Sequence, residues 1–331
     1  MNACVIGAGS WGSAFALYLG RKKIKTRLWV READILEQLQ KNRENKVFLP
    51  GFGFPPAVSF YSKMAEAIAS TELIFIAVPS QFCRAIYTQM VPFFSPDQIL
   101  ISLTKGIEKK TLKRMSEVIA EIFSPSVQPR VAVLSGPSFS REVAENHPTA
   151  LVLASPDQRI AKTIQHLISS LTLRVYTSCD VTGVELAGAL KNVIAIAAGI
   201  SEALNFGSNS LAALMTRGLA EITRLGVKLG AKKETFSGLA GIGDLVLTCT
   251  GKLSRNRSVG LELGKGNSLP EIISNMKMVA EGISTTLSAY QIAHRENVEM
   301  AIFDQVYQIL YKNKDPKKAL LELMSRRLKQ E

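Results

Sequence analysis

The sequence predicts an α/β protein in which a doubly wound parallel sheet is followed by an all-α C-terminal domain. Two observations support this prediction. Close to the N-terminus, the apolar run Ala3–Ile6 leads into the glycine pattern Gly7-x-Gly9-x-x-Gly12, and an amphipathic stretch at 11–19 follows. Apolar runs then alternate with helical segments until about residue 180, after which strand signals largely stop.

The glycine pattern predicts a strand, a tight turn and a helix that together bind a dinucleotide. Gly7 permits the turn, Gly9 lets backbone N–H groups approach a pyrophosphate, and Gly12 lets the helix pack closely on the strand. The helix N-terminus offers the anion unpaired donors and the positive end of its dipole. The alternative is a glycine-rich turn without a ligand, but the position between strand and helix favours a Rossmann domain.

The other elements of this domain follow in chain order. Residues 25–30 alternate as a strand does, 33–42 have helical periodicity, and 48–56 form a loop rich in Pro, Gly and Phe. Further strands are expected at 73–79, 99–103, 131–134, 150–153 and 173–176, separated by helices at 81–90, 112–123 and 158–169. Continuous apolar runs are typical of strands buried on both faces. We therefore expect a parallel, doubly wound sheet within a dinucleotide-binding domain at 1–179.

The second predicted domain, at 180–331, is helical and is expected to bind the substrate and carry out catalysis. Residues 181–200 are rich in Ala, Gly, Val and Leu and have helical length, and helices are also expected at 210–229, 280–295 and 300–311.

Composition narrows the class of protein. At 331 residues, with 47% hydrophobic and 21% charged residues, the chain has the profile of an ordinary soluble globular protein with two domains. No charged n-region and apolar h-region precede the first strand, so we expect no secretory signal, and the longest apolar runs are expected to be too short to span a bilayer. Four scattered cysteines without a C-x-x-C pattern fit a reducing cytoplasm, and three histidines argue against a metal centre or a His-based triad.

The net charge of +12 comes from 40 basic and 28 acidic residues. Such a surplus fits nucleic acid, an anionic membrane surface or phosphorylated small molecules. The basic residues are spread out, and clusters such as Arg21-Lys22-Lys23 have solvated faces as their simplest explanation. No nucleic-acid motif is present, so we expect a phosphate-bearing ligand, no nucleic acid and no integral membrane contact.

Arg31 and Glu32 bear on the choice of cofactor. In this fold an acidic residue about twenty positions beyond the glycines usually holds the ribose 2′-hydroxyl. Here that position is occupied by Arg31, which suits a 2′-phosphate, and Glu32 follows directly. NADP(H) is therefore the preferred cofactor, and NAD(H) is not excluded. The alternative explanation of Arg31 and Glu32 is an ion pair that faces solvent and contacts no cofactor.

Two charged residues lie alone in apolar segments. Lys191 shares its helical face with small residues that include Ala187 and Gly188, so we expect desolvation to lower the pKa of its amine toward a value useful for proton transfer. Asp244 is the only charged residue between Ser237 and Thr250. We expect it to partner Lys191, with Thr248 donating to substrate. The alternatives are a snorkelling lysine and an N-cap aspartate.

Two polar stretches are candidate phosphate or carbonyl contacts. Lys105 follows a buried strand, where ligands bind at the carboxyl ends of parallel strands. The loop at 254–257 carries Arg255 and Arg257, whose fork geometry suits a phosphate. For both, an exposed basic loop is the alternative.

With these residues in view, the chain resembles the bacterial type of NAD(P)-dependent glycerol-3-phosphate dehydrogenase over nearly its whole length. The similarity includes the motifs at 7–12, 135–139, 183–186, 191–193, 238–249, 254–256 and 279–282. It implies a cytoplasmic enzyme that needs no metal and interconverts dihydroxyacetone phosphate and sn-glycerol 3-phosphate by reversible hydride transfer. The glycerol 3-phosphate would supply phospholipid synthesis. A homodimer is a further expectation.

The resemblance also implies roles for individual residues. Lys191 would donate or accept the proton at the C2 oxygen. Substrate contacts are expected at Lys105, Gly136, Lys191, Asp244, Ser254, Arg255 and Asn256. Cofactor contacts are expected at Ser10, Trp11, Arg31, Lys105, Ser140, Arg255, Val279 and Glu281, besides Gly7, Gly9 and Gly12. Ser140 replaces the usual Ala, and the loop at 48–56 is irregular for the family.

The expected arrangement places the nicotinamide between the sheet and the helical domain. Two alternatives remain at this point. One is another two-domain reductase, acting on a 2-hydroxy acid or on 6-phosphogluconate, and the other is a nucleotide-sensing protein without turnover. The stretches at 238–249 and 254–256 argue against the first, and Lys191, Asp244 and Lys105 argue against the second.

Overall fold

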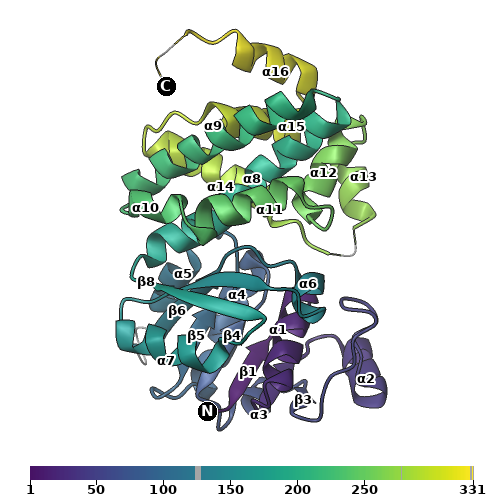
Figure 1. Ribbon diagram of the computed structural model, residues 1–331, viewed down its shortest axis with the longest axis vertical. Helices are drawn as coiled ribbons and strands as arrows, with labels where there is room; N and C mark the ends of the chain where they lie inside the picture. Colours follow the sequence, from purple (N-terminus) through teal and green to yellow (C-terminus); the bar gives the residue numbers. More distant parts are fainter. Residues whose placement is uncertain (124–127, 277, 329, 331) are drawn as a thin grey trace. The chain divides into compact units, whose positions relative to one another are not determined.

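A computed structural model describes residues 1–123, 128–276, 278–328 and 330 (Figure 1). Packing divides the chain into two units. Unit 1 comprises residues 1–105 and 113–185, and unit 2 comprises residues 106–112 and 186–331.

The described residues of unit 1 contain one eight-stranded sheet. Its strands are β1 (Ala3–Ile6), β2 (Thr26–Trp29), β3 (Val58–Tyr61), β4 (Leu73–Ile76), β5 (Ile99–Ser102), β6 (Arg130–Ser135), β7 (Thr149–Ala154) and β8 (Leu173–Ser178). The order across the sheet is β3-β2-β1-β4-β5-β6-β7-β8. The strands up to β3 are added on one side of β1 and those from β4 onward on the other side, so the strand order reverses between β1 and β4. Ligands bind at such a switch point in doubly wound folds.

Helices cover both faces of this sheet. They are α1 (Ser10–Arg21), α2 (Ala33–Asn42), α3 (Met64–Ile68), α4 (Ser80–Met90), α5 (Met115–Phe123), α6 (Ser140–Ala144) and α7 (Gln158–Ile168), with the short η1 (Val91–Phe93). Along β1, Ala3 and Val5 pack with α1, α2, α6 and α7, whereas Cys4 and Ile6 pack with α3, α4 and α5. The strictly apolar strands of the sequence are thus explained by burial on both faces.

One prediction about the sheet is wrong in part, because β7 runs antiparallel to β6. The other neighbouring pairs are parallel. A parallel return needs a crossover, usually a helix that spans the sheet. The link from β6 to β7 holds only the five-residue α6, whereas the eleven-residue α7 allows β8 to return parallel to β7.

In unit 1, β3, α3, α6 and the short η1 were not predicted. β3 pairs only with β2 at the sheet edge and is partly exposed, so it lacks the apolar run of an inner strand. The predicted helix at 112–123 begins later, at Met115, because Leu112 has a φ of +60°, which no α-helix accommodates.

Unit 2 is built from helices among the residues that the structure describes. Beginning with α8 (Val181–Ala203), whose first turn belongs to unit 1, they are α9 (Gly207–Lys228), α10 (Lys233–Phe236), the π-helical turn η2 (Leu239–Gly243), α11 (Asp244–Thr250), α12 (Arg255–Gly264), α13 (Leu269–Ser274), α14 (Glu281–Arg295), α15 (Ala301–Lys312) and α16 (Pro316–Met324). The four helices predicted here are α8, α9, α14 and α15, whose ends agree with the prediction within three residues.

α8 is the central helix of unit 2. It is 23 residues long and apolar enough to cross a membrane by length and composition, but 94% of its most hydrophobic window is buried, which is typical of a core helix. α12 packs directly against it at two glycines. A Cβ on Gly199 would lie 2.0 Å from the Arg257 carbonyl oxygen, and one on Gly260 would lie 1.9 Å from the Ile196 carbonyl oxygen. Side chains cannot fit there, so the two backbones touch.

A buried carboxylate holds the start of α15. Glu221 of α9 accepts hydrogen bonds from the backbone N–H of Ile302, at 3.0 and 3.1 Å, and of Phe303, at 3.4 Å. Burial raises the pKa of Glu221 to about 7, and the two N–H donors only partly oppose this shift.

Candidate active site

The glycine turn has the geometry that its spacing predicts. Gly7 has a φ of +107°, and a Cβ there would lie 2.8 Å from the Ala77 carbonyl oxygen. A Cβ on Gly12 would lie 1.9 Å from the Gly7 carbonyl oxygen, so strand and helix approach too closely for a side chain. A Cβ on Gly9 would meet nothing within 4 Å. Gly9 therefore borders open space, as a residue beside a bound pyrophosphate must.

This open space lies at the N-terminus of α1, whose N-cap is Gly9 and has no side-chain cap. Ser10 and Trp11 form the first turn and are partly buried. A helix N-terminus favours an anion through its N–H groups and its dipole. The residues present thus fit the diphosphate of a dinucleotide.

Arg31 and Glu32 follow β2, the neighbour of β1, and so lie at the same edge of the sheet as the glycine turn. Their side chains form an exposed ion pair with 2.7 Å between Arg31 Nη2 and Glu32 Oε1. The guanidinium also lies 5.7 Å from the ring centroid of Phe82. An exposed pair of this kind is weak, so a ligand phosphate can replace the carboxylate as the partner of Arg31.

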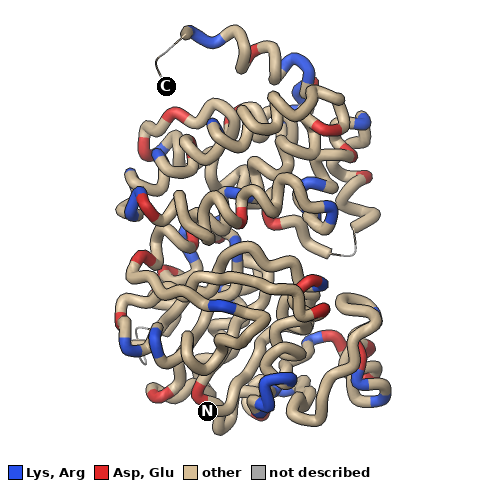
Figure 2. The backbone as a smooth tube through the Cα atoms, viewed as in Figure 1, with Lys and Arg blue, Asp and Glu red and all other residues tan. Residues whose placement is uncertain are grey.

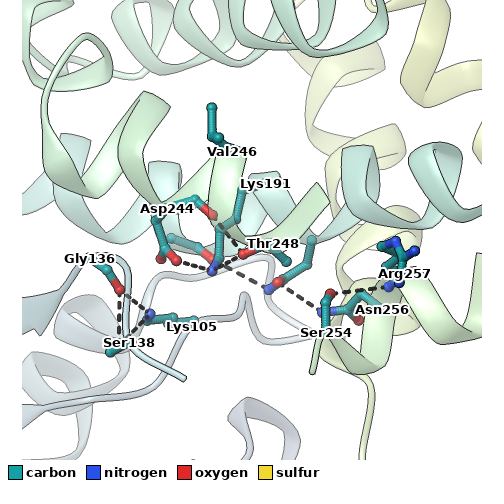
Figure 3. Close-up of polar contacts among 12 residues, drawn as sticks. Lys105, Gly136, Ser138, Lys191, Asp244, Val246, Thr248, Ser254, Asn256 and Arg257 are labelled. Carbon is teal, nitrogen blue, oxygen red and sulfur yellow. Dashed lines mark hydrogen bonds and ion pairs between the residues drawn. The ribbon is translucent and has the colours of Figure 1, made fainter. Parts of the chain in front are cut away.

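Lys105 joins the loops that follow two neighbouring strands, β5 and β6. Its Nζ donates to the Gly136 carbonyl oxygen at 2.7 Å and to Ser138 Oγ at 3.3 Å (Figure 3). Gly136 has a φ of +127°, which favours glycine, and Ser140 begins α6. The structure thus brings together Lys105 and Gly136, and it adds Ser138, to which the sequence analysis assigned no role.

The central feature of unit 2 is a buried ion pair. Lys191 Nζ lies 2.5 Å from Asp244 Oδ1 and 2.7 Å from Thr248 Oγ1 (Figure 3). The two charged side chains are only 7% and 1% exposed. The predicted partnership of Lys191 with Asp244 is therefore present, and its alternatives are wrong: the lysine does not snorkel to the surface, and the N-cap of α11 is Gly243.

This geometry corrects one expectation. Thr248 was expected to donate to substrate, but its hydroxyl donates to the Asp244 carbonyl oxygen at 2.6 Å and accepts from Lys191. A hydroxyl has a single hydrogen, so Thr248 orients the amine. The adjacent carboxylate favours the protonated amine and so opposes the desolvation expected from the sequence.

Cys249 lies near this ion pair, but its thiol is unreactive. Burial raises the pKa of its thiol to about 12, with Asp244 adding to the shift and Lys191 opposing it. A protonated thiol is a poor nucleophile, so Cys249 acts as a small core residue, as predicted.

The stretch at 254–257 is the start of a helix and not the predicted loop. Ser254 is the N-cap of α12 and accepts from the Arg257 backbone N–H at 3.2 Å. Arg257 is buried and pairs with Glu202 of α8, which removes it from the candidate phosphate contacts. Arg255, by contrast, is exposed. Ser254, Arg255 and Asn256 thus gather at one helix N-terminus, a suitable place for a phosphate.

Asn256 links this helix to two others. Its Nδ2 donates to Asn192 Oδ1 at 2.9 Å, and its Oδ1 accepts from the Gly282 N–H at 2.9 Å. Gly282 lies in the first turn of α14, directly after Glu281, and Val279 precedes that helix. No role was predicted for Asn192, because it is uncharged and only the charged residues of α8 stood out from its apolar sequence.

Among the described residues, no group of three or more His, Cys, Asp or Glu side chains is placed to hold a metal ion.

Comparisons with known proteins decide the family. The model for the N-terminal domain of NAD-dependent glycerol-3-phosphate dehydrogenase matches residues 2–161, and the model for its C-terminal domain matches residues 180–321. The chain belongs to the NAD-dependent glycerol-3-phosphate dehydrogenase family. The resemblance expected from the motifs is therefore confirmed.

Individual relatives agree with this assignment. A glycerol-3-phosphate dehydrogenase (NAD(P)+) from Syntrophotalea carbinolica is 52% identical over 100% of this chain and 99% of its own length. Its counterpart from Geobacter sulfurreducens is 50% identical over 99% and 98%. A solved glycerol-3-phosphate dehydrogenase from Coxiella burnetii is 40% identical with a TM-score of 0.94, covering 98% of this chain and 99% of the other.

Membership of the glycerol-3-phosphate dehydrogenase family also decides between the alternatives. The chain is an NAD(P)-dependent oxidoreductase, so a nucleotide sensor without turnover is excluded. A ketopantoate reductase from Ralstonia eutropha has a TM-score of 0.63 at 14% identity, which shows a shared fold alone.

Proposed function

We propose that Lys191 exchanges the proton at the C2 oxygen while sn-glycerol 3-phosphate and dihydroxyacetone phosphate are interconverted. The observation that supports this role is the buried ammonium of Lys191, held by Asp244 and Thr248 at 2.5 and 2.7 Å. When bound, the nicotinamide supplies or accepts the hydride. In the direction of reduction, Lys191 donates its proton to the ketone oxygen as that oxygen gains negative charge.

Asp244 and Thr248 prepare Lys191 for this step. The carboxylate keeps the amine protonated, and the hydroxyl, which donates its own hydrogen to a backbone carbonyl, can only accept from the amine. These two hydrogen bonds fix the direction of the ammonium group. A preorganised cation in a buried site also stabilises the developing oxyanion, usually the larger effect.

The substrate phosphate is assigned to the N-terminus of α12. Ser254 ends the preceding loop there, Arg255 supplies an exposed guanidinium, and Asn256 retains one amide hydrogen after donating to Asn192. Lys105 and Gly136 are proposed as further substrate contacts. The cofactor is assigned to the glycine turn with Ser10, Trp11, Arg31 and Ser140, and to Lys105, Arg255, Val279 and Glu281.

The decisive experiment replaces Lys191 by Ala and measures oxidation of NADPH and NADH with dihydroxyacetone phosphate. We expect kcat to fall at least about 100-fold, the range for loss of a general acid, while cofactor affinity by fluorescence titration stays unchanged. Lys228→Ala, which alters an exposed lysine at the end of α9, is the control and should behave as wild type. Near-normal turnover of Lys191→Ala would remove Lys191 from the mechanism.

We further propose that the enzyme works in the cytoplasm as a homodimer, uses NADP(H) as well as NAD(H), and supplies glycerol 3-phosphate for phospholipid synthesis. Four free thiols support a reducing compartment. Cell fractionation, light scattering and assays with both cofactors test these points separately.

A further inference from the structure

The last helix, α16, has an outer face that the rest of unit 2 leaves uncovered. Its inner side packs on the helical core through Ala319 and Leu323. On its outer side Leu321 is 67% exposed and Met324 is 76% exposed, and Leu328 beyond the helix is 94% exposed. Single exposed apolar residues are ordinary on a protein surface. Three within eight residues form a group that needs an explanation.

Helical spacing puts Leu321 and Met324 on one side of α16, and Leu328 follows beyond the end of the helix. Leu321 and Met324 are three residues apart and therefore neighbours on the helix surface. Lys317 and Lys318 precede Leu321 by four and three residues, so they border the same face. We call Lys317, Lys318, Leu321, Met324, Arg327 and Leu328 the α16 surface.

The α16 surface is basic at both ends. Figure 2 shows Lys and Arg at the start of α16 and again in the segment after it. The two nearby carboxylates are already engaged, since Asp315 accepts from the Lys317 backbone N–H and Glu322 pairs with Lys314 at 2.5 Å. Arg326, just after α16, pairs with Glu299. No ion pair engages Lys317, Lys318 or Arg327 within the part of the chain that the structure describes.

We propose that the α16 surface docks this enzyme reversibly on anionic lipid bilayers. Apolar side chains between basic ones are the pattern of helices that lie in a membrane interface, with the apolar residues below the headgroups and the cations among them. A second copy of the chain fits this surface less well. A two-fold contact would place the same three cations of both copies against one another without a matching negative charge.

The size of the surface sets the strength of the interaction. Three apolar side chains and three cations give weak, reversible binding, and the electrostatic part falls as salt screens it. Each basic residue near an anionic leaflet strengthens binding by about fivefold. Removing two lysines should therefore weaken binding by about twentyfold to thirtyfold.

The test is co-sedimentation of the full-length protein with vesicles of phosphatidylcholine alone and of phosphatidylcholine mixed equally with phosphatidylglycerol. The variants are Lys317→Gln/Lys318→Gln and Leu321→Ser/Met324→Ser. Matched controls remove the same charge or the same kind of apolar surface in unit 1, namely Lys41→Gln/Lys46→Gln and Val47→Ser/Leu171→Ser, all at exposed positions. Helical circular dichroism and NADH oxidation verify that each variant folds.

We expect wild type to bind only the mixed vesicles, more weakly at physiological than at low salt. Both α16 variants should lose most of this binding, while both controls keep it and all proteins retain activity. The proposal is overturned if wild type binds mixed vesicles no better than neutral ones, or if the charge variant and its control lose binding equally. Light scattering that shows self-association abolished by Leu321→Ser/Met324→Ser, without vesicle binding, would assign the surface to a second copy.

Discussion

The ion pair between Lys191 and Asp244 yields the sharpest prediction about stability. Replacing Asp244 by Asn leaves a buried ammonium without its carboxylate, and replacing Lys191 by Met leaves a buried carboxylate without its ammonium. With side-chain exposures of 7% and 1%, neither remaining charge reaches bulk water. Breaking one partner of such a pair costs about 3–5 kcal/mol. The double variant removes both charges, so its loss should be close to that of either single variant.

The expected coupling free energy between the two substitutions therefore equals the loss of one single variant, about 3–5 kcal/mol. Urea denaturation at neutral pH measures it. Both tryptophans, Trp11 and Trp29, lie in unit 1, so tryptophan fluorescence reports the unfolding of unit 1. Unit 2 is helical, so far-ultraviolet circular dichroism reports more strongly on unit 2. The circular dichroism transition should shift in each single variant. Additive losses in the double variant would show that the two charges do not stabilise each other and would refute the argument.

Three further predictions concern other residues. Burial raises the pKa of Glu221 from 4.5 to about 7, so the folded protein binds this proton more tightly than the unfolded chain does. The free energy of unfolding should therefore fall by up to about 3 kcal/mol as pH rises between these two values. Glu221→Gln should abolish this part of the pH dependence in urea titrations at pH 5 and pH 8, and an unchanged slope would contradict it. Gly260→Ala should cost about 1–3 kcal/mol, because the added methyl lies 1.9 Å from a carbonyl oxygen of α8, whereas Gly53→Ala, whose Cβ meets nothing within 4 Å, should be nearly neutral. Equal losses would exclude close helix packing as the cause. Arg31→Asp should raise the KM for NADPH about tenfold more than that for NADH, as expected for loss of a charged phosphate contact, and equal changes would show that Arg31 does not contact the 2′-phosphate.

The sequence by itself determined the features that depend on neighbouring residues. The glycine turn follows from local steric limits, since Gly7 needs a positive φ and Gly12 has no room for a Cβ. The inner strands follow from continuous apolar runs, and α8 from its length and composition. Each of these signals lies within a few turns or strand lengths of chain, so a pattern can reveal it.

Other features depended on which segments come together in space. The direction of β7 follows from the short link through α6, and no property of the β7 residues themselves encodes it. From the sequence, Asp244 has two explanations, a helix cap and a partner for Lys191. Only folding brings the two side chains within 2.5 Å of each other across 53 positions.

The same limit explains the errors at Thr248 and Arg257. Both were expected to serve a ligand from their residue type alone, but tertiary contacts engage the Thr248 hydroxyl with Asp244 and Lys191, and the Arg257 guanidinium with Glu202. The amino-acid sequence shows which side chains can donate or accept hydrogen bonds. Which of them stay available to a substrate is decided by the partners that packing supplies, because a buried polar group must find its hydrogen bonds inside the protein.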